Sequence, residues 1–324
     1  PVLRWSPDSR RIATFRHDGS YLDGRHPSVV MCRGYYTRSV LAAWDLIDGT
    51  LTSRWVFDSW DMDRTWSGQG NHNLSVSDVD GDGKDEILYG SMCVDDDGTG
   101  LYSTGLRHGD AAHLTDLDPD RPGLENWTCL ENRPYGAALW DARTGDVLHH
   151  WQGPKDTGRA CAADIDPRHR GYEMWASAGC PLFDARGNEL APHNRRLPVN
   201  FVINWDGDDL QELLDHTRIL KYNWESGELE TLFDAADYDC VSNNGTKDTP
   251  CLSADLIGDY REEGVWRTRD STELRIFTTT IPARRRLITL MQDTQYRLSV
   301  AWQNVAYNQP PHTSFYLGDG MSEP

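Results

Sequence analysis

The 324 residues predict an all-β fold built from repeated hairpins, and three observations support this prediction. An Asp-rich phrase of the kind DVDGDGKDEILYG recurs at intervals of 38 to 51 residues, and a second phrase of the kind ALWDARTGDVL alternates with it. No long stretch has the 3.6-residue apolar period of a helix. The copies of the first phrase begin at Asp78, Asp116, Asp164, Asn204 and Asp255, and those of the second surround Trp44, Trp140, Phe183 and Trp224.

Each copy consists of an apolar and aromatic run, a short Asp/Gly turn and a second run, which is the pattern of a β-hairpin. A period of about 40 to 50 residues with one such hairpin in every unit is typical of a β-propeller, and we recognise about five or six blade-like units. No Pro- or Ser-rich linker divides the chain, so we expect one propeller domain over residues 1–324. A propeller hides its sheet edges by closing into a ring, so the number of units decides whether the ring is complete.

The composition excludes several classes of partner. Lys and Arg number 32 against 51 Asp and Glu, a formal charge of −19, which disfavours nucleic acids and anionic membranes. No apolar run reaches the roughly 18 residues of a membrane span. The N-terminus has no Met, basic region or apolar region, so we expect either a removed signal peptide or a fragment. The seven cysteines form no CxxC pair, which disfavours a zinc ribbon, although Cys240 and Cys251 flank one polar loop and could pair.

The Asp-rich turns are candidate calcium sites. In the Asp78 loop (residues 78–86) the carboxylates stand at relative positions 0, 2, 4 and 8, and calcium takes six to eight oxygen ligands. The alternative is that the carboxylates cap the backbone of their own turns. In both cases the loops stabilise the blades and are not the active site. The candidate ligands are Asp78, Asp80, Asp82 and Glu86; Asp116, Asp118, Asp120 and Glu125; and Asn204, Asp206, Asp208 and Glu212.

Functional residues are expected where the repeat does not require them. Segments 68–78, 100–116 and 241–255 each end at an acidic loop, so they occupy equivalent places in different blades and should converge near the axis. They carry His72, His108 and Asp110, which together with Glu131 could bind one metal ion. The alternative for each histidine is a hydrogen-bonded structural residue. Imidazole suits transition metals better than calcium, so the residues leave manganese and zinc open.

Several phrases of the chain stand out: YLDGRHPSVVMCRGYYTR, LAAWD, GQGNHNLSVSDVDGDGKDEILYG, VDDDGTGLYSTGLRHGDAAHLTDLDPDRPGLE and WQNVAYNQPPHTSFYLGDG. From about Tyr21 to the C-terminus they resemble the rhamnogalacturonan lyases of polysaccharide lyase family 11. These enzymes are secreted, and they depolymerise rhamnogalacturonan I, the pectin backbone of alternating rhamnose and galacturonate, by β-elimination. The resemblance implies an eight-bladed, calcium-bearing propeller, of which this chain would carry only the C-terminal part of the ring.

The resemblance also implies roles for individual residues. Lys247 would be the base that removes the galacturonate C5 proton, and Arg159, which stays protonated, would bind the substrate carboxylate. A divalent cation would neutralise that carboxylate and stabilise the enolate-like transition state. The alternative for Lys247 is an exposed loop lysine without a catalytic role, and the alternative for Asn244, Gly245 and Thr246 is an ordinary Asn-Gly turn. The metal ligands would be His72, His108, Asp110 and Glu131, and the sugar-binding residues Asn244, Gly245, Thr246, Asn304 and Tyr307.

The sequence leaves two other functions open. One is a non-catalytic, calcium-stabilised propeller that binds carbohydrate or another protein, and the other is a glycoside hydrolase with two carboxylates. For the lyase we expect a pectic polysaccharide as partner, calcium as cofactor, a secreted monomer, and no nucleic acid or membrane partner. Because the chain is acidic, a polyanion would be held by the metal and a local cationic set that includes Arg107, Arg159 and Lys247.

Overall fold

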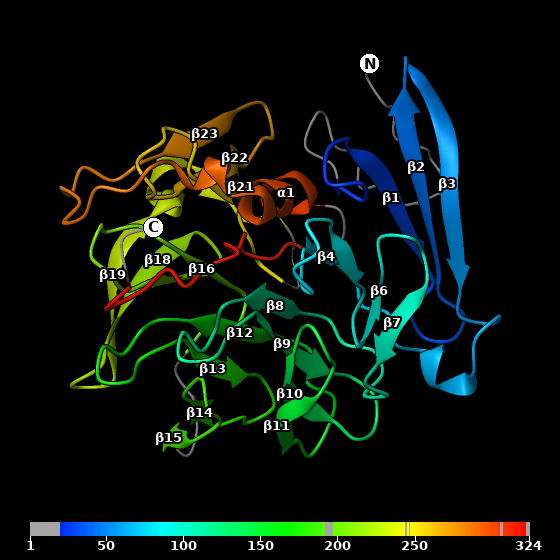
Figure 1. Ribbon diagram of the computed structural model, residues 1–324. Helices are drawn as coiled ribbons and strands as arrows, with labels where there is room; N and C mark the ends of the chain where they lie inside the picture. The colour runs from blue at the N-terminus through cyan, green and yellow to red at the C-terminus, as the bar shows by residue number, and fades with distance from the viewer. Residues whose placement is uncertain (1–19, 192–196, 244, 246, 305–306, 322–324) are drawn as a thin grey trace.

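The predicted all-β class is confirmed by the computed structural model, which describes residues 20–191, 197–243, 245, 247–304 and 307–321. The described chain forms six separate antiparallel sheets (Figure 1). The first three are β1 Ser28–Arg33, β2 Val40–Ile47 and β3 Thr50–Asp58; β4 Ser75–Ser77, β5 Glu86–Leu88, β6 Met92–Val94 and β7 Gly100–Ser103; and β8 Ala112–Thr115, β9 Glu125–Leu130, β10 Gly136–Asp141 and β11 Val147–Gln152.

The remaining sheets continue the same order along the chain. They are β12 Ala160–Ala163, β13 Glu173–Ala176, β14 Leu182–Phe183 and β15 Glu189–Ala191; β16 Phe201–Ile203, β17 Glu212–Asp215, β18 Arg218–Asn223 and β19 Glu228–Asp234; and β20 Cys240–Val241, β21 Leu252–Ala254, β22 Glu263–Thr268 and β23 Leu274–Phe277. The short 3₁₀ helices are η1 Arg64–Trp66, η2 Ala235–Tyr238 and η3 Leu290–Gln292.

The two sequence phrases mark equivalent turns in successive sheets. Each acidic loop joins the innermost strand of a sheet to the next strand, as between β4 and β5 or between β16 and β17. The innermost strands β4, β8, β12 and β16 lie beside one another in chain order (Figure 1). Segments that directly precede these strands therefore come together at the centre, as the repeat predicts.

Each acidic loop is closed by the glutamate that begins its second strand. Glu125 Oε2 accepts the N–H groups of Leu117 and Asp118 at 3.0 and 3.1 Å, and Glu86 Oε2 accepts the N–H of Val79 at 2.7 Å. The same arrangement holds in all five loops, and every one of these glutamates is almost fully buried. A buried backbone N–H requires an acceptor, so the glutamate of the repeat holds the turn together.

Tryptophans connect neighbouring sheets. The indole of Trp127 on β9 donates to the Trp175 carbonyl on β13 at 3.2 Å, and that of Trp175 donates to the Pro198 carbonyl before β16 at 2.7 Å. Both side chains are fully buried. A fully buried large apolar side chain contributes about 1.5–3 kcal/mol, and the hydrogen bond satisfies its one polar atom.

One helix, α1 Thr294–Trp302, departs from the all-β expectation. It lies against β4 and β21, and it buries Tyr296, Leu298 and Trp302 in two different hydrophobic clusters. At nine residues it is too short for a clear helical period in the sequence, and tertiary packing stabilises it. None of the described helices is long and apolar enough to cross a membrane. All seven cysteines lie in the described part of the chain and are free thiols, so the possible Cys240–Cys251 disulfide is absent.

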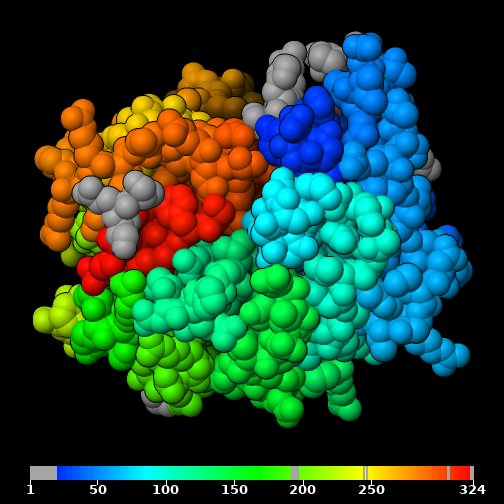
Figure 2. Space-filling model, in the orientation of Figure 1, coloured from blue at the N-terminus to red at the C-terminus, as the bar shows by residue number. Residues whose placement is uncertain are grey.

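The C-terminal segment, residues 308–321, crosses the innermost strands and ties them together. The Thr313 carbonyl accepts from the Thr115 hydroxyl at 2.8 Å, and the Tyr316 hydroxyl donates to Asp164 at 2.6 Å. Figure 2 shows this segment on the surface, in red, between the parts of the chain coloured orange and green.

Candidate active site

Four side chains from three loops converge at the centre of the sheets. His72 precedes β4, His108 and Asp110 precede β8, and Glu131 follows β9. Their ligand atoms all lie within 4.8 Å of one another. His108 Nε2 is 2.8 Å from Glu131 Oε2, and Asp110 Oδ1 is 3.4 Å from His72 Nε2 and 3.6 Å from His108 Nε2. The sequence placed these four residues together, and the structure does the same.

The backbone fixes the orientation of the buried His108 ring. Its Nδ1 lies 2.6 Å from the Gly70 carbonyl, which directs Nε2 toward Glu131. The Glu131 N–H in turn donates to the His108 carbonyl at 2.9 Å. A fixed tautomer and a fixed ring plane are what a histidine ligand requires.

The four side chains fit a divalent cation. Two imidazole nitrogens and two carboxylates face one space, and Asp110 Oδ1 is buried without a hydrogen-bond partner among the described residues. Burial alone raises the pKa of Asp110, but the contacts of His108 and Lys247 outweigh it and lower the pKa to about 2. Asp110 is therefore ionised at neutral pH, as a metal ligand must be.

Two tyrosines that the sequence analysis did not single out complete the site. The Tyr35 ring stacks on His108 with centroids 5.1 Å apart, and the Tyr36 ring lies 4.4 Å from His108. The Tyr36 hydroxyl donates to Glu131 at 3.4 Å. Burial and the Glu131 charge raise the pKa of Tyr36 to about 12, so its hydroxyl keeps its proton. The tandem Tyr-Tyr after Gly34 reads as ordinary strand or core sequence, which is why the pattern did not reveal it.

Lys247 contacts the same carboxylate that faces the histidines. Its Nζ donates to Asp110 Oδ2 at 2.8 Å and to the Gly158 carbonyl at 3.0 Å. The Tyr307 ring lies beneath it, with Nζ 4.7 Å from the ring centroid, and the same ring lies 4.5 Å from that of His72. Asp110 thus joins the candidate metal ligands to the candidate base.

The other predicted substrate residues are dispersed. Asn304 is exposed, its side-chain N–H₂ donates to the Cys251 carbonyl, and its oxygen accepts from Asn243 at 3.3 Å. Gly245 is exposed, and Asn244 and Thr246 lie outside the described residues.

Arg159 is buried, and burial lowers the pKa of its guanidinium. Its Nη2 donates to the carbonyls of Asn200 and, at 3.2 Å, Asn308. Its Nε and Nη1 are buried without a hydrogen-bond partner among the described residues, which leaves two donors for an anion.

The acidic loops differ in how much room they leave for a cation. In the Asp78 loop, Asp78 accepts the N–H groups of Gly81 and Gly83, so it caps its own turn as the alternative proposed. The ligand atoms of Asp78, Asp80 and Glu86 nevertheless lie within 4.8 Å of one another, and so do those of Asp82, Glu86 and Asp96.

Basic side chains enter the other two loops that were predicted to bind calcium, those that begin at Asn204 and Asp116. Asp206, Asp208 and Glu212 gather as predicted, but Lys221 Nζ lies 3.0, 2.8 and 2.5 Å from their oxygens and occupies the space between them. Asn204 turns away and bonds Glu262 at 3.3 Å. In the Asp116 loop arginines take the carboxylates: Arg121 binds Glu125, Arg170 binds Asp120, and Arg186 contacts both Asp118 and Asp120. A cation in either loop has to displace these side chains.

Comparison with known proteins identifies the family. Residues 4–324 match the model of rhamnogalacturonan lyase family 11, C-terminal domain. The chain belongs to this family. Rhamnogalacturonan endolyase YesW and rhamnogalacturonan exolyase YesX of Bacillus subtilis (strain 168) are 53% and 52% identical to it over 97% of the chain. The chain spans about half the length of these curated relatives, 50% and 54%.

Solved structures of the family have the same fold. The YesW structure aligns with a TM-score of 0.90 over 97% of this chain and 52% of its own, at 52% identity. That of Bacillus licheniformis rhamnogalacturonan lyase PL11 aligns with a TM-score of 0.89 over 94% of this chain and 52% of its own, at 54% identity. The family expected from the sequence is therefore confirmed.

Proposed function

We propose that the protein is a polysaccharide lyase that cleaves rhamnogalacturonan by metal-assisted β-elimination at galacturonate. The observation that carries the proposal is the Asp110 carboxylate, which faces His72 and His108 through Oδ1 and binds Lys247 through Oδ2. The base and the cation site share the Asp110 carboxylate, so they lie close enough to act on one sugar. The base can take the C5 proton while the cation binds the neighbouring sugar carboxylate. Two relatives at more than 50% identity are named rhamnogalacturonan lyases, which supports this substrate class.

The reaction breaks two bonds and forms one double bond. Lys247 takes the proton from C5 once its amine is neutral, the electron pair forms the C4=C5 double bond, and the C4 oxygen leaves with the other half of the chain and takes a proton from water. A divalent cation held by the four side chains would neutralise the galacturonate carboxylate and so make the C5 proton more acidic. Asp110 accepts a hydrogen bond from the lysine ammonium that the transfer creates, which stabilises the transferred proton.

Neighbouring groups hold the base in place. The Gly158 carbonyl and the face of Tyr307 position the Lys247 Nζ. A Cβ atom at residue 158 would lie 3.8 Å from this Nζ. We assign Arg159 to the substrate carboxylate, and Asn304 and Gly245 to contacts with the sugar. A general base of this kind contributes about 10² to 10⁴ in rate.

We further propose that the six sheets are part of a calcium-bearing propeller and that the protein is secreted and monomeric. The order of the innermost strands supports the propeller. The Asp78 loop supports a calcium site best, because Glu86 Oε1 is buried there without a partner among the described residues. The oxygen-rich loop suits calcium, whereas the two imidazoles at the centre also suit a transition metal.

The decisive experiment is incubation of the complete protein that carries this chain with rhamnogalacturonan I, with and without added calcium. We expect the ultraviolet absorbance of a conjugated uronate to rise, to stop after chelation and to resume when calcium is restored. New reducing ends without that absorbance would indicate a hydrolase. Binding without shortening of the polymer would indicate a non-catalytic carbohydrate-binding protein.

A further inference from the structure

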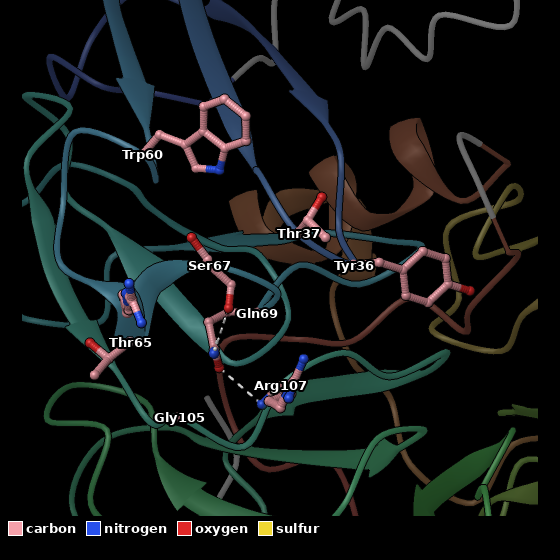
Figure 3. A pocket seen from close by; sticks show the side chains of 9 residues that line it. Tyr36, Thr37, Trp60, Thr65, Ser67, Gln69, Gly105 and Arg107 are labelled. Atoms are coloured by element: carbon pink, nitrogen blue, oxygen red, sulfur yellow. Dashed lines mark hydrogen bonds between the residues drawn. The ribbon is translucent and has the colours of Figure 1, made fainter.

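A cavity of about 430 Å³ adjoins the four clustered side chains and has no role in the mechanism above. Its walls come from the turn after β1, the segment around η1 and the segment before β8. Figure 3 shows the lining residues, with the Tyr36 ring pointing away from the other side chains. The residues that matter to its chemistry are Tyr36, Trp60, Arg64, Ser67, Gln69 and Arg107.

The cavity shares a wall with the candidate active site. Tyr36 lines the cavity, while its ring packs on His108 and its hydroxyl bonds Glu131. Arg107 lines the cavity and directly precedes His108, whereas Gln69 lines it three residues before His72. A ligand that continues past the metal ligands on this side therefore enters the cavity.

Trp60 is an exposed aromatic side chain that its neighbours hold in place. Its exposed fraction is 64%, yet the Arg38 guanidinium lies 4.7 Å from its ring centroid, and Asp58 binds both the Trp60 N–H and Arg38. An indole held rigidly at the surface loses little entropy when a ligand stacks on it, and sugar rings present an apolar C–H face to such platforms.

Arg107 is held in a costly backbone conformation that directs it into the cavity. Its φ is 74°, in the left-handed region that residues other than glycine rarely occupy. The buried Gln69 side chain accepts its N–H at 2.9 Å, and its carbonyl accepts from the Ser91 hydroxyl at 2.6 Å. Strain of this kind persists only where surrounding contacts enforce it, and it is concentrated at binding sites.

Two positive charges in the cavity are uncompensated. The side chains of Arg64 and Arg107 are exposed and make no ion pair or hydrogen bond with any described residue. A guanidinium matches a carboxylate in a planar, bidentate geometry, so the cavity favours a ligand that carries carboxylates.

We propose that this cavity is a second subsite, which binds a galacturonate residue of the polysaccharide beyond the one that is cleaved. Trp60 stacks on the sugar ring, Arg107 and Arg64 pair with the carboxylate, and Ser67 and Tyr36 border the hydroxyl groups. The proposal rests on the lyase function, because a chain of alternating rhamnose and galacturonate offers a new carboxylate at every second residue. An acidic protein can then hold a polyanion at a locally basic site.

The test compares a long polymer with the shortest oligosaccharide that the complete, calcium-loaded protein cleaves. Trp60→Ala and Arg107→Ala should each raise KM for the polymer about tenfold, the effect of losing about 1.4 kcal/mol of binding, with kcat unchanged. The shortest substrate, which does not reach the cavity, should be cleaved with the KM of the unmutated protein. Arg107→Lys keeps the positive charge but loses the planar guanidinium, so its KM for the polymer should lie between those of the unmutated protein and Arg107→Ala.

Matched controls come from the same chain. Trp224 also stacks with an arginine, Arg168 at 5.1 Å, and Arg143 is also exposed without an ion pair, but neither lines the cavity. Trp224→Ala and Arg143→Ala should leave KM unchanged. Melting temperatures within about 2 °C of the unmutated protein show that all variants are folded.

The outcomes separate the subsite from the lyase function. Unchanged KM for the polymer in both Trp60→Ala and Arg107→Ala overturns the subsite while the lyase function stands. If the unmutated protein forms no unsaturated uronate, the lyase function fails, and calorimetric titration with a saturated rhamnose–galacturonate hexasaccharide decides the subsite. Loss of affinity in Trp60→Ala but not in Trp224→Ala supports it, whereas equal affinity, or no binding by the unmutated protein, overturns it.

Discussion

Asp164 should make the stability of the fold depend on pH. Its carboxyl group is fully buried between β12 and β13, where Oδ2 accepts from the Tyr316 hydroxyl and the Asp319 N–H, both at 2.6 Å. Burial raises its pKa to about 7, and the two hydrogen bonds oppose this rise only in part. The neutral acid is therefore the form that the folded protein prefers.

The magnitude follows from the shift. From an ordinary value of 3.8 to about 7 is about 3 pKa units, and each unit corresponds to 1.36 kcal/mol, so the group changes the free energy of unfolding by about 4 kcal/mol. Because the folded pKa is raised, this contribution is fully present below about pH 4 and is lost as the pH rises through about 7. Asp164→Asn keeps an oxygen acceptor and cannot ionise, so it should remove this dependence.

The assay is urea unfolding of the unmutated protein and of Asp164→Asn at several values between about pH 5 and about pH 8, with a chelator present. Carboxyl groups distant from Asp164 titrate equally in both proteins, so the difference between the two curves reports Asp164 together with its charge coupling to Glu173, Asp166 and Asp319. We expect the free energy of unfolding of the variant, relative to that of the unmutated protein, to rise by about 3 kcal/mol from about pH 5 to about pH 8. Parallel curves would refute the reasoning, because burial would then not set the protonation of Asp164.

The remaining predictions concern the active site and the calcium loops. Lys247→Ala should lower kcat about 10²- to 10⁴-fold and change KM little, since a general base acts only in the transition state. Asn304→Ala and Tyr307→Ala should raise KM more than they lower kcat, as expected for groups that bind substrate and transition state equally. Glu131→Gln should abolish lyase activity with little change in Tm, because it removes a ligand charge and keeps the side-chain volume. Asp80→Asn should lower Tm only when calcium is present, by the binding free energy that calcium gives the folded state, about 2.7 kcal/mol at a hundredfold excess over Kd, with near-normal turnover.

Each of these predictions has a control and a contrary result. Lys155→Ala removes an exposed lysine of a nearby loop and should be neutral, whereas near-normal kcat in Lys247→Ala would exclude Lys247 as the base. A collapse of kcat with unchanged KM in Tyr307→Ala would assign Tyr307 to the chemistry. An active Glu131→Gln that melts early, beside an inactive Asp80→Asn that melts normally, would mean that the two classes of metal site are interchanged.

The repeat made the fold and the centre of the site predictable. Every acidic turn follows an innermost strand, so two histidines in the segments before successive innermost strands were expected to meet, and His72 and His108 do. The sequence also separated the four clustered residues from the acidic loops, because only the former break the repeat.

Contacts between distant strands could not be predicted in the same way. Lys221 reaches the carboxylates of the Asn204 loop from β18, and nothing in a pattern of alternating aspartates shows which lysine will lie across from them. Lys247 and Asp110 are 137 positions apart, so their ion pair exists only once the sheets are assembled. Helix α1 forms because it is packed between β4 and β21, and its own nine residues carry little helical signal.

The segment that crosses the innermost strands also sets the order in which the site can be assembled during synthesis. A ribosome releases the histidine ligands long before Tyr307, which packs on His72, and Asn308, which holds Arg159. The sheets can pair as they emerge, but Lys247 and Arg159 reach their final surroundings only when Tyr307 and Asn308 have left the exit tunnel. A nascent chain that stops before Tyr307 would thus carry most of the hydrophobic core and an unfinished candidate site.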